Sequence, residues 1–293
     1  MTAAAWATAV RPKTLAAAVV PVAVGSAVAQ DVGSFAPGPA LAALVGALLI
    51  QVGTNFANDV YDAEKGADTA DRLGPTRAVA SGMLSPTQVK RGMAVVFGLA
   101  VAVGCYLTSV VGWEIFALGL VCIAAGIAYT GGPFPLAYNG LGDVFVMVFF
   151  GFVAVAGTTY VQLGSVSGLA LIAAVPVGTL ATALLVVNNV RDEATDASVG
   201  KRTLVVLLGR RFATAEYFAM LIAAYLVPAL LLAGGNFEPT ILLPWLTAPL
   251  AVKLFARLRR ETGPALNDVL AGTAKLLLLF GVLFAVGLTL GRA

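Results

Sequence analysis

The sequence predicts an all-α protein, a single polytopic membrane bundle of about nine transmembrane helices, and three observations lead to this prediction. Of the 293 residues 59% are hydrophobic and only 11% are charged, whereas charged residues make up about a quarter of a soluble domain. Apolar runs of about twenty residues recur along the chain, and this is the length at which a helix crosses a bilayer. Lys and Arg are confined almost entirely to alternate connections between these runs. We therefore expect residues 1–293 to form one integral-membrane domain.

Each apolar run is expected to be helical because lipid offers no hydrogen bonds to an exposed backbone, and a helix satisfies its own backbone groups. The first run resembles a secretory signal peptide, but many further apolar runs follow it, which favours a retained membrane helix. Proline and glycine inside several runs are compatible with helices in a membrane. The predicted spans cover about residues 14–30, 38–57, 92–111, 113–130, 141–160, 167–189, 213–234, 240–257 and 269–290.

The positions of the basic residues predict the orientation of the bundle. The connections after the first, third, fifth and seventh spans contain no Lys or Arg, whereas the segment before the first span and the connections after the second, sixth and eighth contain nearly all of them; the connection after the fourth span has none. Because Lys and Arg are retained on the cytoplasmic side of a membrane, the N-terminus and the charged loops are predicted to face the cytoplasm, in a multi-pass protein of the cell membrane. Two of these loops are long and polar, at about residues 58–91 and 190–212.

The composition restricts the chemistry that this chain can perform. There is no histidine, which excludes histidine-dependent triads, histidine-ligated zinc or haem and an imidazole base. The two cysteines, Cys105 and Cys122, lie inside apolar runs and provide neither a disulfide framework nor a C-x-x-C motif. Any reaction must therefore use carboxylates, amides, hydroxyls, Lys, Arg or a hard cation. No nucleic-acid partner is predicted, and the sequence leaves the oligomeric state open.

Two clusters of acidic residues occur in this chain of few charges. The first lies in "NFANDVYDAEKGAD" (55–68) and the second in "NNVRDEATDASVGKRTL" (188–204). Both follow an even-numbered span, and both contain the pattern N-[DN]-V-x-D, at 58–62 and at 188–192. This similarity suggests two related half-sites that meet at one end of the bundle, as in membrane folds that bind a substrate between repeated halves.

Neither acidic cluster is favourable for the helix that carries it. Asn188, Asp192 and Asp196 are spaced i, i+4, i+8 and so lie on one face of a continuing helix. In the first cluster, Gly66 is expected to end the helix before Asp68. Carboxylates near a helix C-terminus are disfavoured by about 0.3–1 kcal/mol each, and like charges one turn apart repel. A divalent cation reverses both effects, and Mg²⁺ commonly bridges protein carboxylates to phosphates.

Basic residues alternate with these acids, and their side chains are suited to phosphate oxygens. Two metal-binding carboxylate clusters with basic residues between them, at the mouth of an apolar bundle, predict a receptor for a diphosphate that carries a lipid tail. The basic candidates are Lys65, Arg72, Arg77, Lys201 and Arg202.

Two alternatives compete with this hypothesis. Glu64, Asp71 and Glu193 lie on other faces and are equally well explained as solvated loop charges. A secondary transporter is the main rival class for a charged helical bundle, but a transporter is expected to place ionisable groups near the bilayer midplane. Here they gather at one face, which favours an enzyme.

At these residues the sequence resembles the UbiA superfamily of intramembrane aromatic prenyltransferases, which have nine helices and two aspartate-rich motifs, N-D-x-x-D-x-x-x-D and D-x-x-x-D. "NDVYD" (58–62) and "DEATD" (192–196) correspond to the two motifs, except that Gly66 stands where the third acid is expected and Asp68 is the nearest acid. That displacement is usual in the 1,4-dihydroxy-2-naphthoate polyprenyltransferase branch of menaquinone biosynthesis. Strings similar to that branch are "RPKTL" (11–15), "NFANDVYDAEKGADTADRLGPTR" (55–77), "YNGLGD" with "FFG" (138–151) and "NNVRDEATDASVGKRTLVVLLG" (188–209).

The resemblance implies transfer of a polyprenyl group from polyprenyl diphosphate to 1,4-dihydroxy-2-naphthoate, with loss of carbon dioxide and diphosphate, giving demethylmenaquinol. It implies Mg²⁺ as cofactor and the lipid bilayer as the site of reaction. Another superfamily member, acting on 4-hydroxybenzoate or a different acceptor, is the alternative. The implied metal ligands are Asp62, Asp68, Asp192 and Asp196, the catalytic residues are Asp62, Asp192, Asp196 and Lys201, and the substrate-binding residues are Asn58, Arg72, Arg77, Tyr129, Tyr138, Asn188, Lys201 and Arg202.

Overall fold

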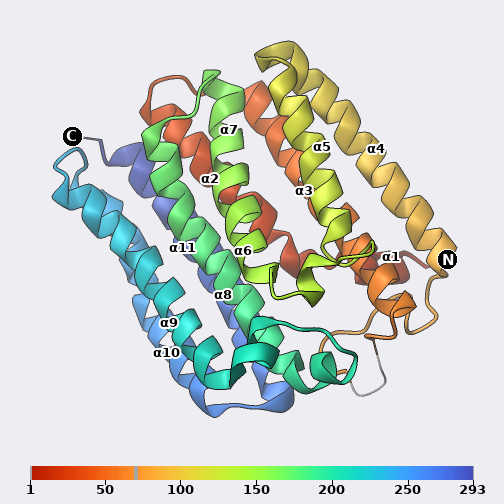
Figure 1. The fold of residues 1–293 in the computed structure, drawn as a ribbon. Helices are drawn as coiled ribbons and strands as arrows, with labels where there is room; N and C mark the ends of the chain where they lie inside the picture. Colours follow the sequence, from red (N-terminus) through yellow and green to blue (C-terminus); the bar gives the residue numbers. More distant parts are fainter. Residues whose placement is uncertain (1, 69–71, 293) are drawn as a thin grey trace.

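The computed structural model describes residues 2–68 and 72–292, and Asp71, interpreted above as a solvated loop charge, lies outside them. The described residues form helices joined by loops and short turns, with one isolated β-bridge between Phe237 and Arg292. Figure 1 shows a bundle whose long helices run roughly side by side. The helices are α1 (Ala3–Val10), η1 (Pro12–Thr14), α2 (Ala16–Asp31), α3 (Pro37–Glu64), α4 (Pro86–Val111), α5 (Trp113–Ala128), η2 (Leu136–Tyr138), α6 (Gly142–Val146), η3 (Met147–Val153), α7 (Ala154–Leu163), α8 (Gly168–Ser198), α9 (Leu204–Ala233), η4 (Pro239–Thr247), α10 (Ala248–Arg260), η5 (Gly263–Ala265) and α11 (Leu266–Leu290).

The predicted all-helical membrane bundle is confirmed. In the described residues, seven helices are long and apolar enough to cross a membrane. An eighth is obtained if Ala3–Thr14 and Ala16–Asp31, which meet at a 47° bend, count as one span. The remaining predicted span corresponds to α5, which is apolar but only 16 residues long. The predicted nine spans therefore match the number of helical segments closely.

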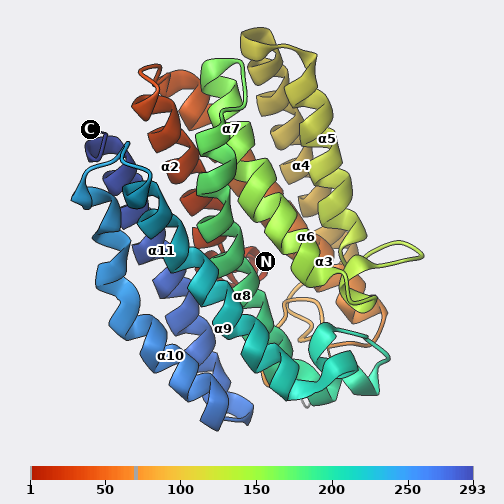
Figure 2. The ribbon, with the colours of Figure 1, turned by 60° about the vertical axis from the view of Figure 1, so that its left-hand side comes forward.

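Helix α8 lies at the centre of the bundle. It packs against α9, η3 and α11, and both views place it between α7 and α9 (Figures 1 and 2). Its contact with the π-helical η3 depends on glycine, because a Cβ on Gly151 would lie 2.8 Å from the Cα of Gly178. Two backbones can approach this closely only where side chains are absent. The central helix is thereby held firmly against the segment that lines the cavity described below.

The acid-bearing helices α3 and α8 continue through residues 58–64 and 190–198 into the predicted polar loops, and α4 and α9 begin inside the same two loops, at Pro86 and Leu204. The charged side chains did not end the helices because acids cost helix stability only modestly near a C-terminus. Helices α3 and α8 end instead at glycines in the left-handed conformation, Gly66 (φ +69°) and Gly200 (φ +72°). The predicted termination by Gly66 is confirmed.

The two helix ends have the same geometry. The amide of Ala67 donates to the carbonyl oxygen of Asp62, and the amide of Lys201 donates to that of Asp196, each at 2.9 Å. This is the hydrogen bond of a Schellman motif. Asp62 and Asp196 therefore occupy equivalent places, although the repeated N-[DN]-V-x-D pattern aligns Asp62 with Asp192. Figure 1 shows the two ends at the same end of the bundle, called the polar end below.

Candidate functional site

The first half of the site is built around Arg77. Its guanidinium lies 3.4 Å from Asp62 Oδ2 and 3.3 Å from Asp68 Oδ1, so one cation joins two predicted metal ligands. Arg72 lies 2.6 Å from the same oxygen of Asp68. The side chains of Asp62 and Asp68 are 8% and 1% exposed. The structure thus brings together four predicted site residues in a nearly water-free arrangement.

The neighbouring Asn58 and Asp59 support this half. Asp59 is fully buried, and its carboxylate accepts hydrogen bonds from the backbone amides of Ala78 (3.2 Å) and Val79 (3.3 Å). These bonds fix the chain directly after Arg77 to helix α3. The side-chain oxygen of Asn58 accepts a hydrogen bond from the Thr130 hydroxyl at 2.9 Å. Asp59 is therefore an anchor for the backbone rather than an open ligand.

The second half of the site lies on the last turns of α8. Arg191 donates through Nε and Nη2 to the two oxygens of Asp192, at 2.8 and 2.5 Å, and through Nη2 to Asn188 Oδ1 at 2.8 Å. Lys201 lies 3.1 Å from Asp196 Oδ1. Each predicted carboxylate of this half is therefore already neutralised by a cation of the chain.

Tyr138 joins the two halves. Its hydroxyl donates to Asp62 Oδ1 at 2.9 Å, and the amines of Lys65 and Lys201 lie 4.7 and 5.6 Å from its ring centroid. Its carbonyl oxygen accepts a hydrogen bond from the backbone amide of Arg202 at 3.0 Å. The Arg202 side chain itself is exposed, so only its backbone takes part in these contacts. The structure thus leaves the side chain of the predicted residue Arg202 at the rim of the site.

The electrostatics of this cluster favour added positive charge. Burial raises the pKa of Asp68 to about 6, and the adjacent Arg72 offsets only part of this effect. Burial, followed by the neighbouring Asp62 carboxylate, raises the pKa of the Tyr138 hydroxyl above its ordinary value. Both shifts have the sign expected where carboxylates are crowded and poorly solvated. A bound cation would oppose both of these increases in pKa.

The donor set fits Mg²⁺ that is shared with a phosphate. In the part of the chain that the structure describes, no group of three or more His, Cys, Asp or Glu side chains could hold a metal alone. One oxygen of Asp68 and one of Asp196 are, however, buried without a hydrogen-bond partner. Mg²⁺ is usually held by one or two carboxylates and completed by water and substrate phosphates. Two separate carboxylate pairs match that pattern and do not match an all-protein cage.

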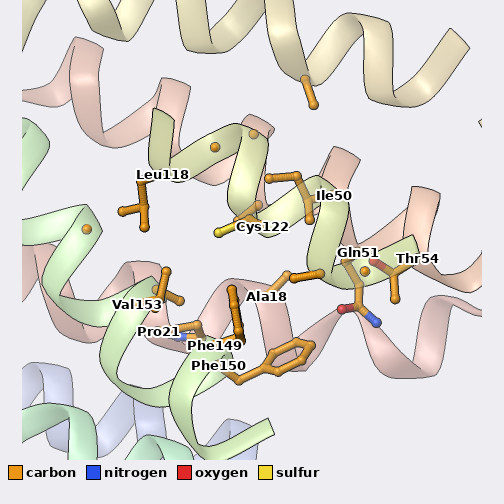
Figure 3. A pocket seen from close by; sticks show the side chains of 18 of the residues that line it. Ala18, Pro21, Ile50, Gln51, Thr54, Leu118, Cys122, Phe149, Phe150 and Val153 are labelled. Atoms are coloured by element: carbon orange, nitrogen blue, oxygen red, sulfur yellow. The ribbon is translucent and has the colours of Figure 1, made fainter. Parts of the chain in front are cut away.

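An apolar cavity of about 310 Å³ leads away from this cluster between α2, α3, α4, α5 and the η3–α7 segment. Figure 3 shows Ile50 of α3 and Phe149 and Val153 of η3 directed into it, with Gln51 and Thr54 at one side. Its lining also includes Asn55, Asn58 and Tyr129, so it reaches the polar end. Predicted Tyr129 therefore lies in the cavity wall, next to Gly142.

Sequence reasoning missed Arg191 and Asn267 as members of the site. Arg191 is one of the basic residues of the predicted loop 190–212, from which only the orientation of the bundle is predicted above, although its position three residues after Asn188 places it beside the predicted acidic row. Asn267 lies in the first turn of α11 and accepts a hydrogen bond from Arg191 Nη1 at 3.0 Å. No local sequence pattern predicts that contact, because 76 residues separate Arg191 from Asn267.

A polytopic bundle with an apolar cavity that reaches Asn58, one helical turn from the buried, paired carboxylate of Asp62, has the features of a membrane receptor for an amphiphilic anion. Comparison with known proteins gives the family. The model of the UbiA prenyltransferase family matches residues 18–270, and the chain belongs to this family. It is accordingly a multi-pass membrane protein.

Relatives and solved structures agree with this assignment. The chain is 40% identical over 300 residues to a 1,4-dihydroxy-2-naphthoate octaprenyltransferase of Escherichia coli (strain K12), covering 98% of this chain and 96% of that protein. It is 35% identical over 286 residues to the protein of that name from Mycobacterium leprae (strain TN), covering 97% and 96%. A UbiA homolog from Archaeoglobus fulgidus bound to GPP and Mg²⁺ has the same fold, with a TM-score of 0.70 at 15% identity, covering 97% of this chain and 99% of that one.

Proposed function

We propose that this protein transfers a polyprenyl group from polyprenyl diphosphate to 1,4-dihydroxy-2-naphthoate, releasing carbon dioxide and diphosphate and forming demethylmenaquinol. The observation that carries the proposal is the buried cluster of Asp62, Asp68, Asp192 and Asp196, each paired with Arg or Lys, next to an apolar cavity whose lining reaches Asn58. The names of the two bacterial relatives support the choice of acceptor. We place the polar end on the cytoplasmic side, as the distribution of Lys and Arg favours.

The head of the donor would bind by exchange of ion-pair partners. Arg72, Arg77 and Lys201 each contact a carboxylate here, and the same donors suit diphosphate oxygens. The freed carboxylates would hold Mg²⁺, which would supply positive charge to the leaving group. The free oxygens of Asp68 and Asp196 are the first candidates to contact it. The exchange keeps the buried site close to electrical balance, which limits the cost of burying charge.

The residues around the reacting carbon then control its chemistry. The allylic carbon–oxygen bond breaks, and its electron pair leaves with the diphosphate, whose charge the basic side chains stabilise. The apolar wall formed by Ile50, Phe149 and Val153 excludes water from the carbocation. The naphthoate carbon that bears the carboxylate attacks it, and loss of that carboxylate as carbon dioxide restores the aromatic ring. Tyr129 lines the cavity and the Tyr138 hydroxyl donates to Asp62, which supports a role for both in binding the acceptor.

The acceptor is tested with purified protein, Mg²⁺ and a polyprenyl diphosphate. We expect prenylation of 1,4-dihydroxy-2-naphthoate labelled in its carboxyl carbon to release labelled carbon dioxide in equal amount to product. Removal of Mg²⁺ by a chelator should stop both. Prenylation of 4-hydroxybenzoate in the absence of any reaction with the naphthoate would overturn the proposed acceptor and leave a prenyltransferase of another specificity.

Filling the cavity should discriminate between long and short tails. Gly119 lines the cavity, and a Cβ at this position would have no heavy atom within 4 Å. We expect Gly119→Phe to reduce kcat/KM for a polyprenyl diphosphate of eight isoprene units by about tenfold or more, and to affect geranyl diphosphate much less. About 1.4 kcal/mol of lost tail binding corresponds to such a factor. The measurement is the ratio of kcat/KM for the two donors.

Gly98 provides a matched control for this substitution. A Cβ at Gly98 would likewise have no heavy atom within 4 Å, but this residue lies on the exposed face of α4 and outside the cavity lining. Gly98→Phe should leave the ratio of long to short donors unchanged. An equal loss for both donors in Gly119→Phe would contradict the assignment of the cavity to the tail.

A further inference from the structure

Three segments that are distant in the sequence meet beside the acidic cluster. The arginine segment, residues 72–77, carries Arg72 and Arg77, and the carbonyl oxygen of Leu73 within it accepts a hydrogen bond from Asn267 Nδ2 at 2.9 Å. Asn267 is the second residue of α11, and its Oδ1 accepts a hydrogen bond from Arg191 of α8 at 3.0 Å. One side-chain amide therefore connects the first half of the site to the second.

The surroundings of this amide are tightly fitted. The Arg191 side chain is fully buried, and its contacts to Asp192, Asn188 and Asn267 use Nε and both terminal nitrogens. Gly74 follows Leu73, and a Cβ added there would lie 2.7 Å from Arg191 Nη2 and 3.0 Å from Arg72 Nη2. The arginine segment can approach α8 this closely only because residue 74 has no side chain. The contact between the arginine segment and α8 thus depends on both Gly74 and the buried Arg191 side chain.

The arginine segment is consequently held at two points. Asp59 accepts from the amides of Ala78 and Val79, just after the segment, and Asn267 donates to Leu73 near its beginning. Arg72 directly precedes Leu73 and Arg77 directly precedes Ala78, so each arginine lies beside one of these two points. A loop that is fixed in advance loses less conformational freedom when its side chains bind a ligand.

We propose that Asn267 is a positioning residue that holds the arginine segment against α8, so that Arg72 and Arg77 are directed at the diphosphate of the donor. The inference rests on the proposed function of the site. The two hydrogen bonds of the Asn267 side chain go to Leu73 and Arg191, and in this assignment Asn267 does not touch the substrate. Its effect should therefore fall on binding of the diphosphate and not on the acceptor.

The two ends of the amide can be tested separately. Asn267→Asp keeps an oxygen that accepts from Arg191 but removes the N–H group that donates to Leu73. Asp268→Asn is the matched control, because the next residue is on the same helical turn, its side chain is 77% exposed, and it pairs with Arg257 at 3.4 Å. Gly74→Ala disturbs the same contact from the other side, which gives a second variant if Asn267→Asp folds poorly.

The expected result is a selective change in donor affinity. With farnesyl diphosphate as donor, Asn267→Asp should raise the KM for the diphosphate about tenfold, which corresponds to about 1.4 kcal/mol. The KM for the naphthoate should change less than twofold, and Asp268→Asn should behave like the unsubstituted protein. Trypsin should cleave after Arg72 and Arg77 faster in Asn267→Asp and in Gly74→Ala. Added Mg²⁺ and inorganic diphosphate should protect these variants less than the unsubstituted protein.

The outcomes separate the positioning role from a general structural role and from the proposed function. Equal trypsin cleavage and equal KM values in Asn267→Asp and Asp268→Asn would overturn the inference. So would a uniform loss, in which both KM values and kcat worsen together with the unfolding temperature. If the unsubstituted protein transfers no prenyl group, the proposed function fails, and the trypsin comparison alone then decides the positioning role.

Discussion

Asp62→Asn is expected to lower kcat for prenyl transfer by about a hundredfold or more while the protein remains folded. The amide keeps an oxygen for the Tyr138 hydroxyl, so the contact between the two halves is retained. It removes the negative charge that Arg77 contacts in the structure and that Mg²⁺ needs when the donor binds. Loss of one preorganised electrostatic contact to a developing charge typically costs about 10²–10³ in kcat. The measurement is single-turnover prenyl transfer at saturating Mg²⁺.

Glu64→Gln is the matched control for this substitution. Glu64 is the last residue of the same helix and is half exposed in its pair with Lys90. Exposed ion pairs contribute about 0–1 kcal/mol, so Glu64→Gln should retain near-normal turnover and unfolding temperature. If Asp62→Asn were nearly as active as Glu64→Gln at low Mg²⁺, Asp62 would have no role as a metal ligand. This comparison also tests the interpretation of Glu64 as a solvated charge.

Much of this architecture is determined by local sequence. The apolar runs predict where helices cross the membrane because lipid leaves the backbone no alternative. Gly66 predicted the end of α3, since only a residue without a side chain adopts a left-handed conformation at little cost. The spacing of Asn188, Asp192 and Asp196 predicted that the three side chains lie on one helix face. They do so because α8 continues to Ser198. These features depend on neighbours within one or two turns.

The remaining features depend on contacts between distant segments, and for that reason they were missed. Nothing near residue 267 in the sequence indicates that Asn267 donates to Leu73, which is 194 positions away. The same holds for the burial of Arg191, whose environment is completed by α11 and the arginine segment. The role of Asp59 as a backbone anchor likewise emerges only when residues 78–79 fold back onto α3. A sequence motif shows which chemical groups a site contains, whereas tertiary packing determines which of these groups remain free to bind a ligand.

The pairing of Arg191 with Asp192 predicts a large effect on stability. The Arg191 side chain is fully buried and that of Asp192 is 5% exposed. Removing one partner of a buried ion pair leaves an uncompensated charge and costs about 3–5 kcal/mol. We therefore expect Arg191→Met to lower the free energy of unfolding by that amount, measured by denaturant titration of the protein in detergent. Prenyl transfer should fall as well, because Asp192 loses the contact that orients it.

A double variant separates the two consequences. Replacing both partners of a buried ion pair by apolar groups of similar size is often neutral for stability. Arg191→Met combined with Asp192→Leu should therefore recover much of the lost unfolding free energy, although Asn188 and Asn267 still lack their common donor. Its prenyl transfer should nevertheless remain as low as that of a variant without the Asp192 carboxylate. Recovery of activity together with stability would show that Asp192 serves only to neutralise Arg191. Recovery of stability alone would assign the carboxylate to the reaction and the arginine to holding it in place.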